Sequence, residues 1–214
     1  MAESYVIGVD FGSDSVRALI VNTETGENVG QGVACYPRWK AGLYQHPEHS
    51  IFRQHPLDYL ESLEKCITTA LAELTEEQKD HVIGIGVDTT GSTPVPVDKN
   101  GTPLALLDEF AENENAMFFL WKDHAAAAEA DEINKLFRNN SENDYTKYQG
   151  DYSAEWYWAK ILYAVRHDEA IRQAAYTWEE HCDWMTGILC GETRPEKIYH
   201  SACAAGHKAL WHSE

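Results

Sequence analysis

The first 36 residues contain three apolar runs joined by two short turns, and this arrangement constrains the fold more than any other feature. Tyr5 to Asp10 reads YVIGVD, Val16 to Asn22 reads VRALIVN, and Val29 to Tyr36 forms the third run. Tight connections join neighbouring antiparallel strands, because a parallel pair needs a much longer crossover. The sequence therefore predicts a three-stranded antiparallel meander at the start of the chain.

A helix with one apolar face follows a long loop, which we predict for Arg38 to Gln54. Pro56 suits the first position of this helix. Apolar side chains then recur every three or four residues, at Leu57, Leu60, Leu63, Ile67, Leu71 and Leu74. Val82 to Asp88 (VIGIGVD) has the pattern of a buried strand. We expect it to pair parallel with the first strand, with the helix in the crossover, so that an α/β domain with a mixed sheet results.

The rest of the chain is predicted to contain one further strand and three helices. The strand is Pro94 to Asp98, and Asn139 to Gly150 reads as a polar loop. The helices are predicted at Lys122 to Phe137, at Ser153 to Ala175 with Ser153 as the N-cap, and at Glu180 to Leu189 with Gly191 just past the end.

The net charge of −18 argues against two classes of partner. Nucleic acids bind surfaces rich in Lys and Arg, and anionic membranes attract basic segments. The chain has five cysteines, an odd number, with no C-x-x-C pair. They are interpreted as reduced, mostly buried thiols of a cytoplasmic protein. No run is long and apolar enough to span a membrane, and Glu3 and Asp10 interrupt any signal-peptide pattern.

Ten histidines occur, and six of them fall into two groups. None has the sequence spacing of a zinc-binding motif, so a structural zinc is not expected. The acidic stretch from Asp108 to Glu114 is interpreted as a solvated loop.

The turn between the first two strands is the main candidate site. Gly12 permits a backbone conformation closed to other residues, and Ser13 and Ser15 supply hydroxyls beside turn N–H groups that can hold an anion. Arg17 is a candidate phosphate partner, and Asp10 could hold a metal-bound water. The alternative reading is an ordinary hairpin turn with a surface arginine.

The pattern D-x-G-[ST]-x-[ST]-x-R at this turn resembles the phosphate loop of the actin, Hsp70 and sugar-kinase superfamily. Further stretches, in the same order, resemble FGGY carbohydrate kinases. In Ile83 to Asp98, Gly91 and Ser92 occupy the turn that carries sugar contacts in that family, where glycerol kinases have an Arg–Glu pair. The resemblance implies a ribonuclease H-like mixed β-sheet with flanking helices.

Two other stretches narrow the resemblance to the ribulokinase branch of this family. Leu120 to Ala126 (LWKDHAA) is similar to a W-x-D-x-R stretch of pentulose kinases, so Trp121 would form a wall of the sugar site. Ser201 to His212 is close to C-x-A-G-x-K-A-x-W-H, which implies that Lys208 contacts the sugar. Without the resemblance, these would read as a core Trp and a surface Lys. Cys182 to Gly187 also matches, and we assign it to packing.

The resemblance implies transfer of the γ-phosphoryl group of ATP to L-ribulose, with Mg²⁺ and with Asp10 acting through water. Residues 1–214 would form most of the sugar-binding domain, and the adenine-binding domain and the catalytic base, an Asp, are expected beyond residue 214. Another pentulose kinase, such as a xylulokinase, is the alternative; a non-catalytic sugar- or nucleotide-binding module is the alternative for residues 1–214 alone. The sequence leaves open whether the protein is a homo-oligomer.

Overall fold

The computed structural model describes residues 3–140 and 144–210 and divides into two compact units. Unit 1 contains the described residues up to Leu43 together with His55–Thr90. Unit 2 contains Tyr44–Gln54 and the described residues from Gly91 onward. Trp211 and His212, the last two positions of the Lys208 stretch, lie outside the described residues.

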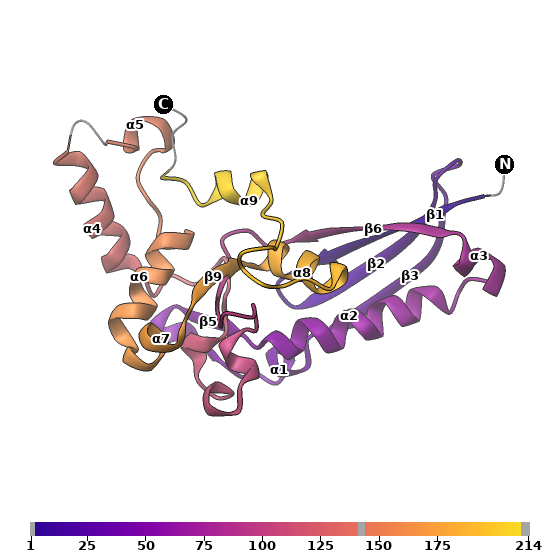
Figure 1. Ribbon diagram of the computed structural model, residues 1–214, viewed down its shortest axis with the longest axis horizontal. Helices are drawn as coiled ribbons and strands as arrows, with labels where there is room; N and C mark the ends of the chain where they lie inside the picture. The colour runs from indigo at the N-terminus through magenta and orange to yellow at the C-terminus, as the bar shows by residue number, and fades with distance from the viewer. Residues whose placement is uncertain (1–2, 141–143, 211–214) are drawn as a thin grey trace. The chain divides into compact units, whose positions relative to one another are not determined.

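Unit 1 is built on a four-stranded sheet in the order β3-β2-β1-β6 (Figure 1). Its strands are β1 (Tyr5–Phe11), β2 (Ser15–Asn22), β3 (Asn28–Cys35) and β6 (Val82–Thr89). Strands β1, β2 and β3 pair antiparallel, and β6 pairs parallel with β1. The predicted meander and the predicted parallel pairing of β6 are therefore confirmed, and the sheet is mixed. The expectation that this strand is buried is wrong, because Ile83 and Ile85 have exposed fractions of 70% and 41%.

Helix α2 (Pro56–Leu71) runs along one face of this sheet and packs on β2 and β3 (Figure 1). Two glycines of β3 allow the close approach. A Cβ atom at Gly30 would lie 2.6 Å from the Ala70 carbonyl oxygen, and one at Gly32 would lie 2.1 Å from the Cys66 carbonyl oxygen. Any side chain at these positions would push the helix away from the sheet.

The residues that α2 buries differ in part from the predicted apolar series. The buried face includes Tyr59, Leu63, Cys66 and Ala70. Four members of the predicted series, Leu57, Leu60, Ile67 and Leu71, are only half-buried. The small Cys66 and Ala70 side chains face the glycines of β3, where the backbones come closest. The tight helix–strand contact therefore selects small residues for its centre and leaves larger apolar residues at its flanks.

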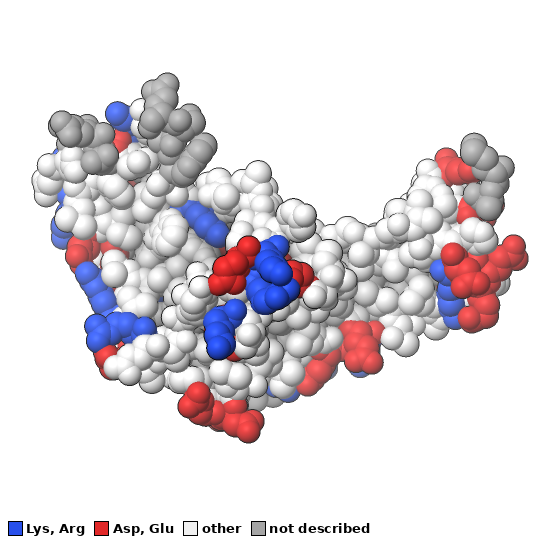
Figure 2. Space-filling view, in the orientation of Figure 1, with Lys and Arg blue, Asp and Glu red and all other residues white. Residues whose placement is uncertain are grey.

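The sheet of unit 1 also carries apolar side chains that are exposed. Leu19 of β2 and Val33 of β3 have exposed fractions of 46% and 59%, and Ile85 of β6 is exposed too. They line a hollow of about 1100 Å³. Unit 1 is completed by α1 (Pro37–Lys40) and α3 (Glu76–Asp80). Figure 2 shows acidic side chains gathered at the end that carries α3, whose first turn contains two glutamates.

Unit 2 contains shorter strands and more irregular chain. Strands β4 (Gln45–His46), β5 (Ile51–Gln54) and β8 (Phe118–Phe119) form one antiparallel sheet, and β7 (Pro94–Val97) pairs antiparallel with β9 (Thr177–Glu180). The helices are α4 (Ala127–Arg138), α5 (Thr146–Gln149), α6 (Tyr157–His167), α7 (Glu169–Ala174), α8 (His181–Cys190) and α9 (Ala202–His207). Short 3-10 turns are found at Pro47–His49, Leu104–Leu106, Asp108–Phe110 and Glu114–Ala116.

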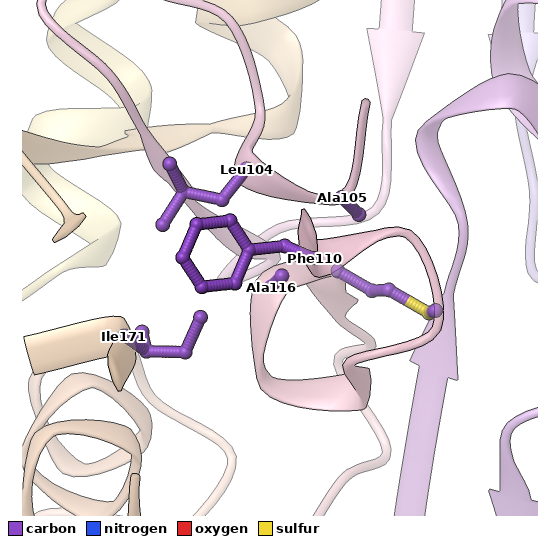
Figure 3. Packing of buried hydrophobic residues seen from close by; sticks show 6 residues of the cluster. Leu104, Ala105, Phe110, Ala116 and Ile171 are labelled. Carbon is purple, nitrogen blue, oxygen red and sulfur yellow. The ribbon is translucent and has the colours of Figure 1, made fainter. Parts of the chain in front are cut away.

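One apolar cluster of unit 2 forms around Phe110, which belongs to the acidic stretch interpreted as a solvated loop. Figure 3 shows the Phe110 ring pointing toward Leu104 and Ile171. Ala105, Ala116 and Met117 complete the buried cluster. The stretch is thus anchored through Phe110, although its carboxylates are polar. A second cluster joins Ala126, Ala130 and Ile133 to Tyr152 and Ala159.

Several sequence-based element boundaries are wrong in unit 2. The predicted helix from Ser153 to Ala175 is two helices, because Asp168 breaks it and its side chain accepts the Ile171 N–H at 3.1 Å as the cap of α7. Ser153 does not cap α6, which begins at Tyr157. The helix predicted from Lys122 begins at Ala127. The loops predicted for Arg38–Gln54 and Asn139–Gly150 contain short helices or strands, apart from residues 141–143, which are outside the described residues.

The cysteines also differ from expectation. Only Cys66 is fully buried, while Cys35, Cys190 and Cys203 are exposed. All five are free thiols. Cysteine is among the residue types most often buried, so the expectation followed the general tendency and failed for this chain.

None of the helices in residues 3–140 and 144–210 combines the length and the apolar character that crossing a membrane would require.

Candidate active site

The turn between β1 and β2 is closed by its own backbone. The Gly12 N–H donates to the Ser15 carbonyl oxygen at 3.0 Å, and the Tyr36 hydroxyl donates to the Gly12 carbonyl oxygen at 3.2 Å. Gly12 does not have a positive φ, so the predicted special backbone conformation is wrong. What favours glycine is space, since a Cβ atom there would lie 3.3 Å from the Ser15 carbonyl oxygen.

Asp10 and Arg17 lie directly opposite each other on β1 and β2. An Arg17 guanidinium nitrogen is 3.5 Å from an Asp10 carboxylate oxygen, and the exposed fractions of the two side chains are 59% and 51%. An ion pair this exposed contributes little to folding, so both groups can turn to a ligand at small cost. Ser15 is buried and its hydroxyl donates to an Asp14 carboxylate oxygen at 3.0 Å, whereas Ser13 is half-buried.

Gly91 and Ser92 form the turn before β7, as the sequence predicts. Ser92 has a φ of 51°, a left-handed conformation that is uncommon for a residue with a side chain. A Cβ atom at Gly91 would lie 2.9 Å from the His207 ring. The structure therefore brings the Gly91–Ser92 turn against the residue that precedes Lys208.

Lys160 of α6 connects two of the predicted sugar-contact segments. Its ammonium group donates to the Ser92 carbonyl oxygen at 2.6 Å and to the Leu120 carbonyl oxygen at 2.8 Å. The side chain is fully buried, and this burial lowers the pKa of Lys160 to about 7. Lys160 thus fixes the Gly91–Ser92 turn relative to the residue before Trp121.

Trp121 follows the buried Leu120, and 42% of its surface is exposed. The segment is held by Asp123, which is fully buried. An Asp123 carboxylate oxygen accepts the Phe52 N–H at 2.7 Å and also pairs with the Arg53 guanidinium, which is equally buried. Asp123 therefore anchors the segment to β5, and Trp121 is left with a large exposed surface.

Lys208 lies just after α9 and lines a cavity of about 700 Å³ with Tyr157, Trp158, Glu179 and His200. Its ammonium nitrogen is 4.4 Å from the centre of the Tyr157 ring, a cation–π contact. The Lys208 carbonyl oxygen accepts the Tyr152 hydroxyl at 3.0 Å. A cation over an aromatic ring, in a cavity that aromatic and acidic side chains also line, suits the recognition of a polyhydroxylated ligand.

The predicted site residues fall into two sets. Asp10, Gly12, Ser13, Ser15 and Arg17 belong to unit 1, and Gly91, Ser92, Trp121 and Lys208 belong to unit 2. Within unit 2, the contacts of His207 and Lys160 connect the second set. Sequence reasoning missed Lys160, although a lone cation within the aromatic run WYWAKILYAV was a visible signal.

Comparison with known proteins places this chain among sugar kinases. A family model described as the N-terminal domain of the FGGY family of carbohydrate kinases matches residues 5–204. A ribulokinase of Vibrio parahaemolyticus is 53% identical over 98% of this chain and 37% of its own length. A ribulokinase of Mycolicibacterium smegmatis is 37% identical over 98% of this chain and 37% of its own length. The chain therefore spans about 37% of the length of these curated relatives.

Solved structures share the fold at much lower identity. A xylulose kinase from Bifidobacterium adolescentis aligns over 96% of this chain and 39% of that chain, with a TM-score of 0.72 and 17% identity. A glycerol kinase from Plasmodium falciparum aligns over 97% of this chain and 37% of that chain, with a TM-score of 0.71 and 15% identity. These likenesses confirm the predicted fold class. Because the family model matches nearly all of the sequence, the chain belongs to the FGGY family of carbohydrate kinases.

Proposed function

We propose that these residues belong to a ribulokinase, which transfers the γ-phosphoryl group of ATP to L-ribulose and yields L-ribulose 5-phosphate for arabinose catabolism. The observation that carries the proposal is the placement of Lys208 in a cavity with aromatic and acidic side chains. The 53% identity to a ribulokinase of Vibrio parahaemolyticus supports it. A second pentulose kinase activity, on xylulose, is the alternative, because a xylulose kinase shares the fold.

The 214 residues supply most of the sugar-binding domain in this proposal. The catalytic base and the adenine-binding domain are supplied by other parts of the protein. The match to the N-terminal domain of the family supports this division, as does the 37% share of the Vibrio relative that the chain covers.

Four residues of unit 2 form the proposed sugar contacts. Lys208 donates hydrogen bonds to sugar hydroxyls, and Trp121 offers a half-exposed aromatic face. Gly91 and Ser92 offer backbone groups at a turn that Lys160 holds in place. Donors fixed before the substrate arrives lose little entropy on binding, which is how such a site can align a hydroxyl for transfer.

The phosphate contacts are proposed at the β1–β2 turn of unit 1. Gly12 and Ser13 present the turn backbone, Ser15 closes the turn, and Arg17 offers a reachable guanidinium. Asp10 is a half-exposed carboxylate, a hard oxygen donor of the kind Mg²⁺ accepts, and would hold the ion through water. An ion held there would supply neutralisation of the phosphate charge, and phosphoryl transfer depends mainly on such neutralisation and on alignment.

We also propose that the protein is cytoplasmic and that its ligands are ATP and a small sugar. A net charge of −18 disfavours binding to nucleic acids and to anionic membranes.

A panel of ketopentoses tests the proposed substrate. The assay uses the protein with its nucleotide-binding domain and follows ADP formation with L-ribulose, D-ribulose, L-xylulose and D-xylulose. We expect the highest kcat/KM with L-ribulose. A higher kcat/KM with D-xylulose would replace the proposal with the alternative.

Residues 1–214 alone are predicted to show no kinase turnover, because general-base catalysis is absent from them in this account. The measurement is ATP-dependent phosphorylation of L-ribulose by the purified chain against a blank. Turnover above the blank would contradict the proposed division of the protein. Sugar binding without turnover would agree with it and would make the isolated chain a binding module.

A further inference from the structure

Three residues from separate segments of unit 2 meet at one point. Glu179 lies near the end of β9, Asp183 lies in the first turn of α8, and His200 lies shortly before α9. One ligand atom from each, a carboxylate oxygen or an imidazole nitrogen, falls within 4.8 Å of the other two. The sequence spacing of Glu179, Asp183 and His200 matches no zinc-binding motif, so only the fold reveals the group.

The two carboxylates of this group are buried to an unusual degree. Glu179 has an exposed fraction of 1% and Asp183 of 2%. Burying a carboxylate costs several kcal/mol unless a cation or several donors compensate, and two neighbouring carboxylates repel each other as well. Burial is also the main reason that the pKa of Glu179 is raised, with Asp183 adding to the effect. Two buried carboxylates, Glu179 and Asp183, would therefore be stabilised by a nearby positive charge.

Asp183 provides a second, independent indication of a ligand. Its Oδ1 atom accepts the Ser201 N–H at 2.8 Å, but its Oδ2 atom, although buried, has no hydrogen-bond partner within the described residues. Buried polar atoms without a partner are rare in native proteins and point to a bound water or ion. Glu179 and His200 already share a contact of 2.9 Å, so two of the three groups face each other.

We propose that Glu179, Asp183 and His200 bind a divalent transition-metal ion of the zinc class. Zinc accepts imidazole nitrogen and carboxylate oxygen at about 2.0–2.2 Å, so modest side-chain movement would bring the three ligand atoms onto one ion. The imidazole favours zinc over Mg²⁺ and Ca²⁺, which prefer oxygen ligands throughout. Glu179 and His200 line the 700 Å³ cavity, from which water can complete the coordination.

The ion would stabilise the segment that leads to Lys208. Ser201 caps α9, where its hydroxyl accepts the Ala204 N–H at 3.4 Å, and α9 ends immediately before Lys208. With His200 tied to β9 and α8, the start of α9 is fixed. The rival sources of positive charge are a protonated His200 and Lys208, both of which lower the pKa of Glu179 against the effect of burial. These rivals require no metal, so metal binding separates the two explanations.

The test is a Zn²⁺ titration of the purified protein, stripped with a chelator, by isothermal titration calorimetry. The exposed thiols of Cys35, Cys190 and Cys203 are alkylated first, because they could bind zinc themselves. We expect one site per chain. Asp183→Asn keeps the acceptor for the Ser201 N–H, and His200→Ala removes a half-exposed ring, so both variants should fold. Each should weaken binding at least about tenfold.

His167→Ala is the matched control, because it removes an exposed histidine of the same unit. It should change the affinity less than about twofold. Co²⁺ gives an independent readout, with visible ligand-field bands that carry no thiolate contribution and that disappear in His200→Ala. A lack of saturable Zn²⁺ binding below about 0.1 mM would overturn the proposal. Equal affinity in the parent and in both ligand variants would overturn it too.

Discussion

The two units use the same chemical pair, an arginine and an aspartate, in opposite ways. In unit 1, Asp10 and Arg17 face each other across two strands, and about half of each side chain is exposed. In unit 2, Arg53 and Asp123 form a pair that is almost completely buried. The exposed pair can exchange its partner for a ligand, whereas the buried pair cannot be broken without leaving an uncompensated charge. Exposure thus decides whether a charge serves binding or folding.

Two lysines of unit 2 differ in the same way. Lys160 is buried and donates hydrogen bonds to two carbonyl oxygens, whereas Lys208 is half-buried and lines a cavity. We therefore expect substitutions of Arg53, Asp123 and Lys160 to act mainly on stability. Substitutions of Arg17 and Lys208 should act mainly on ligands.

The largest effect is expected from Asp123→Asn. It leaves the buried Arg53 guanidinium without its counter-ion, which should lower the free energy of unfolding by about 3–5 kcal/mol. Urea denaturation followed by circular dichroism measures this. Asp131→Asn is the control, since Asp131 forms an exposed pair with Lys135 on α4 and should cost under about 0.5 kcal/mol. Similar losses for both variants would refute the contrast between buried and exposed pairs.

A smaller effect is expected from Lys160→Met, which keeps the length of the side chain but removes its donors. The Ser92 and Leu120 carbonyl oxygens lose their bonds to Lys160, and the loss should lower the free energy of unfolding by about 1–3 kcal/mol. In the complete kinase, the KM for the sugar should rise, because the Gly91–Ser92 turn loses the hydrogen bond from Lys160 that positions it. An unchanged KM together with unchanged stability would rule out the proposed positioning role.

Lys160 should also make stability depend on pH. Burial lowers the pKa of Lys160 to about 7, with Arg53 acting in the same direction and Glu180 and Glu155 against it. Because an unfolded lysine keeps its proton up to about pH 10.4, the unfolded chain binds more protons above pH 7, and stability rises with pH there. The parent should gain up to about 1.4 kcal/mol per pH unit relative to Lys160→Met between about pH 7 and 10. A difference that stays flat would contradict this.

The smallest effect on stability is expected from Arg17→Gln. The pair with Asp10 is half exposed, so its loss should change the free energy of unfolding by less than about 1 kcal/mol. In the complete kinase, the KM for ATP should rise while the KM for the sugar stays the same. A rise in the KM for the sugar alone would remove Arg17 from the phosphate site.

Much of unit 1 could be predicted because its contacts follow from local sequence. The β1–β2 and β2–β3 connections are short, and α2 has a clear apolar periodicity. The exact set of buried residues on α2 was missed, because it depends on Gly30 and Gly32 of another element. The burial of β6, the short helix α1 and the backbone of Gly12 also differ from the prediction. Strand β9 was not predicted either, because it depends on a partner that is distant in the sequence. It pairs with β7, where Pro94 lies opposite Glu180, and no local sequence pattern indicates this pairing.

The candidate site was predicted through motifs rather than through contacts. Gly91, Ser92, Trp121 and Lys208 stood in recognisable stretches, but the residues that hold them did not. Asp123 was visible only as part of a motif, and its burial with Arg53 follows from the pairing of β5 and β8. The group of Glu179, Asp183 and His200 depends on three separate segments, so sequence spacing could not indicate it.

The central claim is that Lys208 meets the sugar, and steady-state kinetics of Lys208→Ala in the complete kinase test it most directly. A hydrogen bond from a charged donor contributes about 1.5–3 kcal/mol, so kcat/KM for L-ribulose should fall roughly ten- to a hundredfold, with a smaller change in the KM for ATP. Lys197→Ala, which removes an exposed lysine from the same unit, should change kcat/KM less than about twofold. A Lys208→Ala variant with the parent's melting temperature and an unchanged kcat/KM for L-ribulose would contradict the account.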